Sequence, residues 1–161
     1  MDRKEMIIFI GIQASGKTTF YHQHLAEYVH ISLDILHTRN KERIALEECF
    51  SSGNSMVIDN TNPTAADRAG YISKAKAHGY HITGYFFRSC ISDCVRRNEK
   101  REGKAKVPKT AIAATSNKLE MPDYAEGFDK LYFVHMENET MIIEDWKEEA
   151  SLQLETKVPN Y

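Results

Sequence analysis

The stretch Met6-Ile-Ile-Phe-Ile10, followed directly by Gly11-Ile-Gln-Ala-Ser-Gly16-Lys17-Thr18, decides the fold of this chain. An uninterrupted apolar run of this length predicts a strand buried on both faces, as in a parallel sheet. The segment after it fits the pattern G-x-x-x-x-G-K-S/T, in the strand, turn and helix context that this pattern requires. The sequence therefore predicts a phosphate-binding P-loop over residues 11–18.

The residue types of this loop suit the phosphates of ATP. Gly11 and Gly16 let the backbone curl so that successive amides point at one phosphate, and the positive end of the following helix adds to the attraction. Lys17 can neutralise the β- and γ-phosphates, and Thr18 can offer its hydroxyl to a Mg²⁺ ion that arrives with the nucleotide. The residues expected to bind ATP are Gly11, Gln13, Ala14, Ser15, Gly16, Lys17, Thr18, Thr19 and, from a later segment, Arg97.

Length and composition indicate one folded domain over residues 1–161. Apolar residues make up 42% and charged residues 27% of the 161, as in ordinary globular proteins. The longest apolar run is far too short for a membrane span and no signal-peptide core follows the first residues, so we expect a cytoplasmic protein. Three cysteines without an export signal predict reduced thiols and not a disulfide framework.

Strands and helices alternate along the chain. Strands are predicted at 6–10, 29–33, 56–58, 81–87 and 128–136, and helices from residue 17 or 18 and at 41–50, 65–78, 91–101, 108–119 and 141–150. Because crossovers between parallel strands place helices on the sheet faces, we expect an α/β fold with a mostly parallel five-stranded sheet. Ligands of such sheets bind at the carboxyl ends of the strands.

Acidic residues follow two of these strands. Asp34 comes after the second strand, where its carboxylate could accept the proton of an attacking hydroxyl as a general base. A helix cap for the segment that follows is the alternative, and the two roles are compatible. Asp59 ends the third strand, the position of an acid that organises Mg²⁺ together with Thr18. Asn60 and Asn62 after it could hold the substrate or could form an Asx turn.

A basic segment follows the fourth strand. Residues 96–109 carry a local charge of +5, which leaves −7 for the rest of the chain. Arg97 and Arg101 stand four apart on one helix face, next to a polar connector, as a closing lid over residues 97–110 would need. Arg101 is the candidate for stabilising the transferring phosphoryl group. A solvated basic helix face is the alternative.

In combination these segments resemble the polynucleotide 5′-hydroxyl kinase family of P-loop phosphotransferases over about residues 5–136. The resemblance rests on the P-loop, Asp34, Asp59-Asn-Thr-Asn-Pro63 with Arg68, Arg97-Asn-x-x-Arg101 and Val107-Pro108. It implies a P-loop kinase-like three-layer sandwich with a helical lid. It also implies ATP and Mg²⁺ at Lys17 and Thr18, activation of the 5′-hydroxyl by Asp34 and contact of Arg101 with the moving phosphate.

One position departs from the family pattern. His37 stands where phage-type members carry an arginine three residues after the catalytic aspartate, and Arg39 follows two residues later. Arg39 is therefore the candidate ligand for the acceptor. Together with it, the residues expected to contact the substrate are Asp59, Asn60, Asn62 and Arg68.

The sequence favours the first of three functions and keeps the other two as alternatives. The first is ATP-dependent phosphate transfer to the 5′-hydroxyl end of a DNA, an RNA or an oligonucleotide. The second is a P-loop kinase of a small molecule such as a nucleoside, a sugar or an antibiotic. The third is a nucleotide-binding switch, for which replacement of Asp34 would leave ATP turnover nearly unchanged.

Overall fold

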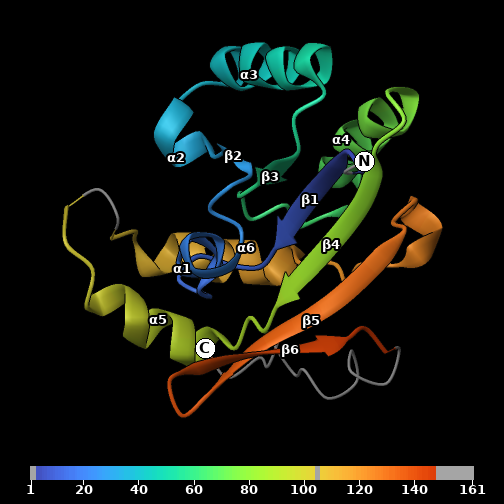
Figure 1. Cartoon of the computed structure of the whole chain (residues 1–161). Coiled ribbons are helices and arrows are strands. Elements are labelled where there is room, and N and C mark those ends of the chain that lie inside the picture. The colour runs from blue at the N-terminus through green and yellow to red at the C-terminus, as the bar shows by residue number, and fades with distance from the viewer. Residues whose placement is uncertain (1–2, 104–105, 148–161) are drawn as a thin grey trace.

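The central sheet determines where the predicted site lies. In the computed structural model, which describes residues 3–103 and 106–147, six strands form one sheet in the order β2-β3-β1-β4-β5-β6 (Figure 1). The strands are β1 (Glu5–Ile10), β2 (Val29–Ile31), β3 (Met56–Ile58), β4 (His81–Phe87), β5 (Lys130–Glu137) and β6 (Thr140–Asp145). The first five run parallel and β6 is antiparallel to β5. The predicted α/β class with a mostly parallel sheet is confirmed.

Helices cover both faces of this sheet. They are α1 (Lys17–His24), α2 (Leu33–Leu36), α3 (Arg39–Ser52), α4 (Ala65–Ala77), α5 (Ile91–Glu99), α6 (Lys109–Lys118) and the 3-10 helix η2 (Tyr124–Glu126). Leu46 of α3, Ile72 of α4, Cys94 of α5 and Ile112 of α6 belong to one buried apolar cluster, whereas Phe20 of α1 belongs to a second cluster on the other face. Burial of apolar surface on both faces stabilises the three layers. Within the described residues, no helix is long and apolar enough to cross a lipid bilayer.

The end of the described chain differs from the prediction. The sequence predicts five strands and a helix over 141–150, but Thr140–Asp145 form the sixth strand, and residues 148–150 lie outside the described residues. Asn138 and Glu139 take positive φ angles of 50° and 65°, as in two-residue turns whose twist matches that of a hairpin. This turn reverses the chain, so that β6 pairs with the edge of β5. A helix in its place would leave the backbone groups of that edge unpaired.

Several helix boundaries also differ from the predicted ones by one or two residues, and two of them bear on the site. Helix α3 starts at Arg39 and not at residue 41, because Thr38 acts as its N-cap and its hydroxyl accepts a hydrogen bond of 3.1 Å from the Lys41 amide. Helix α5 ends at Glu99, two residues before the predicted end. Arg101 therefore belongs to the connector and not to the helix.

The parallel strands bring four segments to one edge of the sheet. β1 leads into the P-loop, β2 into α2, β3 into Asp59 and β4 towards α5. In Figure 1, α1 and α5 lie on the side toward which the arrowheads of β1 and β4 point. This is the edge at which ligands of parallel sheets bind.

Candidate active site

The P-loop leaves no room for side chains at its two glycines. A Cβ at Gly11 would lie 2.8 Å from Ser15 Oγ and 3.0 Å from Phe87 Cβ. Gly16 has a φ of 102°, which L side chains rarely adopt, and a Cβ there would lie 2.5 Å from Met141 Cε. The loop is therefore a tight turn, and α1 begins directly after it at Lys17.

The ammonium group of Lys17 is buried inside this turn. Its Nζ donates to the carbonyl oxygens of Gly11 at 3.1 Å and Ile12 at 2.9 Å. Burial lowers the pKa of Lys17, whereas the nearby carboxylates of Asp59 and Asp34 raise it and Arg101 lowers it. The structure thus brings Asp59, Asp34 and Arg101, which come from separate stretches of the sequence, close enough to Lys17 to shift its pKa.

Asp59 lies beside the start of α1. Its Oδ2 accepts a hydrogen bond of 2.8 Å from Thr18 Oγ1 and is 2.7 Å from His30 Nε2. The His30 ring stacks on Tyr21, with centroids 3.9 Å apart and the planes at 13°. One hydroxyl and one carboxylate are therefore adjacent, which is an oxygen set that Mg²⁺ prefers.

A cleft of about 860 Å³ opens at this edge, and Asp34 lines it together with Lys17 and Arg101. Ser32 and not Asp34 is the N-cap of α2, so the helix-cap alternative for Asp34 is wrong. The predicted site residues that line the cleft are Gln13, Ala14, Lys17, Thr18, Asp34, Arg39, Asp59, Asn60, Asn62 and Arg101.

The asparagines at the cleft wall are engaged by the protein itself. Asn60 Oδ1 accepts a hydrogen bond of 2.9 Å from the Leu33 amide, in the first turn of α2. Asn62 has a φ of 45°, and its Nδ2 donates to the Phe9 carbonyl at 2.8 Å. Both side chains thus fix the loop after β3, through contacts with distant backbone groups and not through the Asx turn that the sequence offered as the alternative.

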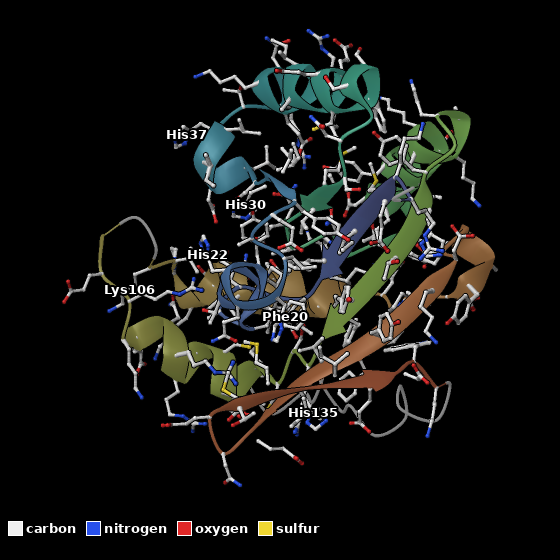
Figure 2. The ribbon with its side chains drawn as sticks, viewed as in Figure 1. Phe20, His22, His30, His37, Lys106 and His135 are labelled. Atoms are coloured by element: carbon white, nitrogen blue, oxygen red, sulfur yellow. The ribbon has the colours of Figure 1, made fainter. Side chains whose placement is uncertain are left out.

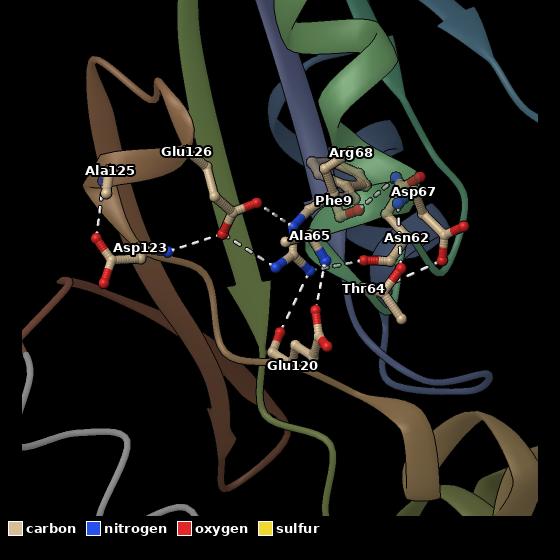
Figure 3. A network of polar contacts seen from close by, with 10 residues as sticks. All are labelled: Phe9, Asn62, Thr64, Ala65, Asp67, Arg68, Glu120, Asp123, Ala125 and Glu126. Atoms are coloured by element: carbon tan, nitrogen blue, oxygen red, sulfur yellow. Dashed lines mark hydrogen bonds and ion pairs between the residues drawn. The ribbon is translucent and has the colours of Figure 1, made fainter.

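Arg68 lies elsewhere than predicted. Its side chain is fully buried, and its Nε and Nη2 donate to the two oxygens of Glu126 at 2.8 and 3.0 Å. Its Nη1 donates to the carbonyls of Asn62 and Glu120 (Figure 3). The guanidinium therefore connects the start of α4 to residues 120–126. Arg68 does not line the cleft, so the predicted contact with a substrate is wrong.

The lid segment, residues 97–110 with 104–105 outside the described residues, is fastened at its base. Asn98 Nδ2 donates to the Val107 carbonyl at 2.6 Å, and the Val107 amide donates to Asn98 Oδ1 at 2.9 Å. Arg97 Nη1 donates to the Ala14 carbonyl at 2.8 Å, so the lid also contacts the P-loop. Figure 2 shows Lys106 of this segment on the same side of the molecule as His37.

Five predicted ATP ligands are not among the residues that line the cleft. Ser15 and Arg97 line a second, smaller pocket between α5 and the β5–β6 hairpin, and Thr19 is exposed on α1. Gly11 and Gly16 contribute backbone alone, as expected. The phosphate loop is thus bordered by one pocket on each side.

Sequence reasoning missed several residues of the site. His30, whose ring contacts Asp59, sits inside a strand and carries no motif. Glu42 and Tyr71 hold the Arg39 guanidinium, with Glu42 Oε1 3.0 Å and the Tyr71 hydroxyl 2.9 Å from Arg39 Nη1. Burial and the Glu42 carboxylate raise the pKa of Tyr71 to about 12. No local signal indicates these contacts, because their partners come from separate elements.

Two relatives with known names match the chain in sequence. A protein of Acanthamoeba polyphaga mimivirus, provisionally named bifunctional polynucleotide phosphatase/kinase, is 32% identical over 155 residues, which are 90% of this chain and 37% of that protein. The bifunctional polynucleotide phosphatase/kinase of Schizosaccharomyces pombe is 28% identical over 132 residues, 79% of this chain and 32% of that protein. The chain thus spans about a third of the length of these relatives.

Solved structures with low sequence identity share the fold. The AvrRxo1-ORF1:AvrRxo1-ORF2 complex with sulphate superposes with a TM-score of 0.72 at 12% identity, over 99% of this chain and 65% of that chain. The same complex with ATP gives 0.70 at 11% identity, over 99% and 65%. Kti12 of Chaetomium thermophilum in complex with ADP-AlF3 gives 0.62 at 16% identity, over 95% and 96%.

A family model described as AAA domain matches residues 6–45 and 42–122, a range that contains the P-loop, Asp34, Asp59 and the lid. The resemblance to polynucleotide kinases is confirmed by the relatives that carry that name. The chain, with its phosphate loop between β1 and α1, belongs to the AAA domain family of P-loop proteins.

Proposed function

We propose that the protein transfers the γ-phosphate of ATP to the 5′-hydroxyl end of a polynucleotide or oligonucleotide. The observation that carries the proposal is that Asp34, Lys17 and Arg101 line one cleft. A base, a phosphate ligand and a positively charged side chain that stabilises the transferring group are the parts that phosphoryl transfer requires. The names of the relatives support a nucleic acid as the acceptor.

The residues around the P-loop fit ATP and Mg²⁺. Gly11 and Gly16 form a tight turn in which a Cβ at either position would clash with a neighbouring side chain, and Lys17 Nζ donates to the Gly11 carbonyl inside that turn. Gln13, Ala14 and Thr18 line the cleft and belong to the proposed nucleotide set, which Ser15, Thr19 and Arg97 complete from positions outside the cleft. Thr18 and Asp59, with their oxygens 2.8 Å apart, would hold Mg²⁺ or its waters. When bound, the ion supplies positive charge that neutralises the phosphates.

Asp34 acts in the proposed reaction as the general base. Its carboxylate takes the proton from the acceptor 5′-hydroxyl, whose oxygen forms a new bond to the γ-phosphorus. The bond between that phosphorus and the oxygen it shares with the β-phosphate breaks, which leaves ADP. Arg101 stabilises the charge on the transferring group, and the lid over residues 97–110 closes to exclude water.

Arg39 is the proposed ligand of an acceptor phosphate. Its side chain is 70% exposed and lines the cleft two residues after His37. Asn60 and Asn62 contribute by shaping the wall. The three free thiols fit the reducing conditions of the cytoplasm, where we place the protein. We further propose that residues 1–161 act as one kinase domain.

Transfer of labelled γ-phosphate to oligonucleotides tests the proposal. DNA and RNA with a 5′-hydroxyl are offered in parallel, and the same strands with a 5′-phosphate serve as controls. Label is expected on the 5′-hydroxyl strands alone. If ATP binds but label reaches neither DNA nor RNA, the polynucleotide acceptor is wrong. A panel of nucleosides and sugars would then test the alternative of a small-molecule kinase.

A further inference from the structure

A buried carboxylate lies behind the acceptor side of the cleft. Glu42, on α3, is 4% exposed, and three donors converge on its two oxygens. Oε1 accepts from Arg39 Nη1 at 3.0 Å, and Oε2 accepts from Asn60 Nδ2 at 3.0 Å and from the Tyr71 hydroxyl at 2.9 Å. A buried carboxylate with this many donors is held in one position.

One arm of this cluster leads to the proposed base. Asn60 donates to Glu42 through Nδ2 and accepts from the Leu33 amide through Oδ1. Leu33 is the first residue of α2, a four-residue helix whose second residue is Asp34. So short a helix has little stability of its own, and its orientation depends on such contacts. Glu42 thus fixes the turn that carries Asp34.

The other arm leads to the proposed acceptor ligand. Arg39 Nη1 contacts both Glu42 and the Tyr71 hydroxyl, while the side chain as a whole is 70% exposed and lines the cleft. Because one nitrogen is already hydrogen-bonded, the Arg39 side chain has lost much of the rotamer freedom that it would otherwise lose on binding a phosphate. Its other nitrogens remain available to the phosphate. Glu42 therefore also presets Arg39.

We propose that Glu42 is a positioning residue that sets acceptor recognition, by fixing Arg39 and the Asp34 turn from a single buried carboxylate. The inference rests on the proposed function. Tyr71 is the second member, since its hydroxyl donates to Glu42 and accepts from Arg39. The nucleotide side of the cleft has no part in this cluster, because none of the three donors on Glu42 comes from the P-loop.

Glutamine at this position cannot replace the carboxylate. A glutamine offers one acceptor oxygen and one amide donor, whereas both oxygens of Glu42 accept. Its amide would face either Arg39 or the pair of Asn60 and Tyr71, and one side of the cluster would open. Glu42→Gln keeps the shape of the side chain and removes this function.

Steady-state transfer to a 5′-hydroxyl oligonucleotide tests the proposal. For Glu42→Gln, the acceptor KM should rise about ten-fold or more and kcat should fall, while the KM for ATP stays within about two-fold. Tyr71→Phe, which removes a single hydroxyl, should shift the acceptor KM in the same direction by less. Adding Arg39→Ala to Glu42→Gln should raise the acceptor KM by less than Arg39→Ala does alone, because the two act through one contact.

Glu47→Gln is the matched control. Glu47 lies on the same helix, is 64% exposed and pairs with Arg43, so its loss should leave both KM values unchanged. An unchanged acceptor KM in a folded Glu42→Gln variant would overturn the inference, and so would full additivity with Arg39→Ala. If Glu42→Gln does not fold, an unchanged acceptor KM in Tyr71→Phe overturns it. Absence of transfer by the wild-type protein is a different result, which contradicts the proposed function itself.

Discussion

The hydroxyl of Thr18, in the first turn of α1, donates a hydrogen bond of 2.8 Å to Oδ2 of Asp59, the residue that follows β3. The same oxygen is 2.7 Å from His30 Nε2. A single carboxylate thus links the phosphate loop to the strand beside it, because β1 and β3 are parallel neighbours whose carboxyl ends meet.

Asp59→Asn tests the proposed metal role of this carboxylate. Transfer should fall about 10- to 100-fold and the Mg²⁺ concentration for half-maximal activity should rise, because a charged oxygen ligand is lost. A Mg²⁺ titration of the transfer rate measures both. Asp145→Asn, at an exposed residue of β6 that pairs with Lys130, serves as the control. An Asp59→Asn variant with the wild-type rate and midpoint would exclude the metal role.

Arg101→Ala tests the lid. Arg101 lines the cleft from the connector after α5, and its loss should lower kcat about 100- to 1,000-fold, as removal of a group that stabilises transition-state charge does. ATP affinity should change little. Arg96→Ala, an exposed residue of α5 that pairs with Asp93, should retain activity. Equal rates for the two variants would remove Arg101 from the catalytic set.

Arg68→Ala should destabilise the protein but leave the transfer activity of the folded variant unchanged. The change would strand the Glu126 carboxylate, which is 13% exposed, and should lower the free energy of unfolding by about 3 to 5 kcal/mol. Arg43→Ala, which removes an exposed ion pair, should cost at most about 1 kcal/mol. Urea unfolding compares them. A stable Arg68→Ala variant with a raised acceptor KM would restore the substrate contact predicted from the sequence.

The protein should lose stability in alkaline solution. The pKa values of Tyr28, Tyr71 and Tyr85 are raised to about 12, in each case chiefly by burial, from an ordinary value of 10.0. The folded state favours the neutral phenols. Their contribution to the free energy of unfolding is therefore complete below pH 10 and is lost as the pH rises towards about 12. Thermal unfolding across this range, followed with tyrosinate absorbance, should show ionisation together with unfolding. Tyrosines that ionise with an ordinary pKa in the folded protein would contradict this.

The sequence predicts well what depends on local pattern. The P-loop follows from one apolar run and one spaced motif, and the positions of Asp34 and Asp59 follow because parallel strands end at one edge. The structure agrees with each of these placements.

What the sequence could not predict depends on contacts between distant segments. Arg68 has the residue type of a substrate ligand, but its partner Glu126 lies 58 residues later, and only the packing of η2 against α4 brings them together. Glu42 and Tyr71 are 29 residues apart, on two helices. The sequence predicts a helix where β6 lies, because the acidic residues around Asn138 and Glu139 give no local signal of the hairpin turn that precedes the strand.

Transfer of labelled γ-phosphate from ATP to a 5′-hydroxyl oligonucleotide by the protein and by Asp34→Asn tests the central claim most directly. The account predicts transfer by the wild-type protein and a loss of about 100-fold or more in the variant, with ATP binding unchanged, because the variant lacks the group that takes the proton. Equal transfer by the two proteins would contradict the role of Asp34. Absence of transfer by a wild-type protein that binds ATP would contradict the polynucleotide acceptor.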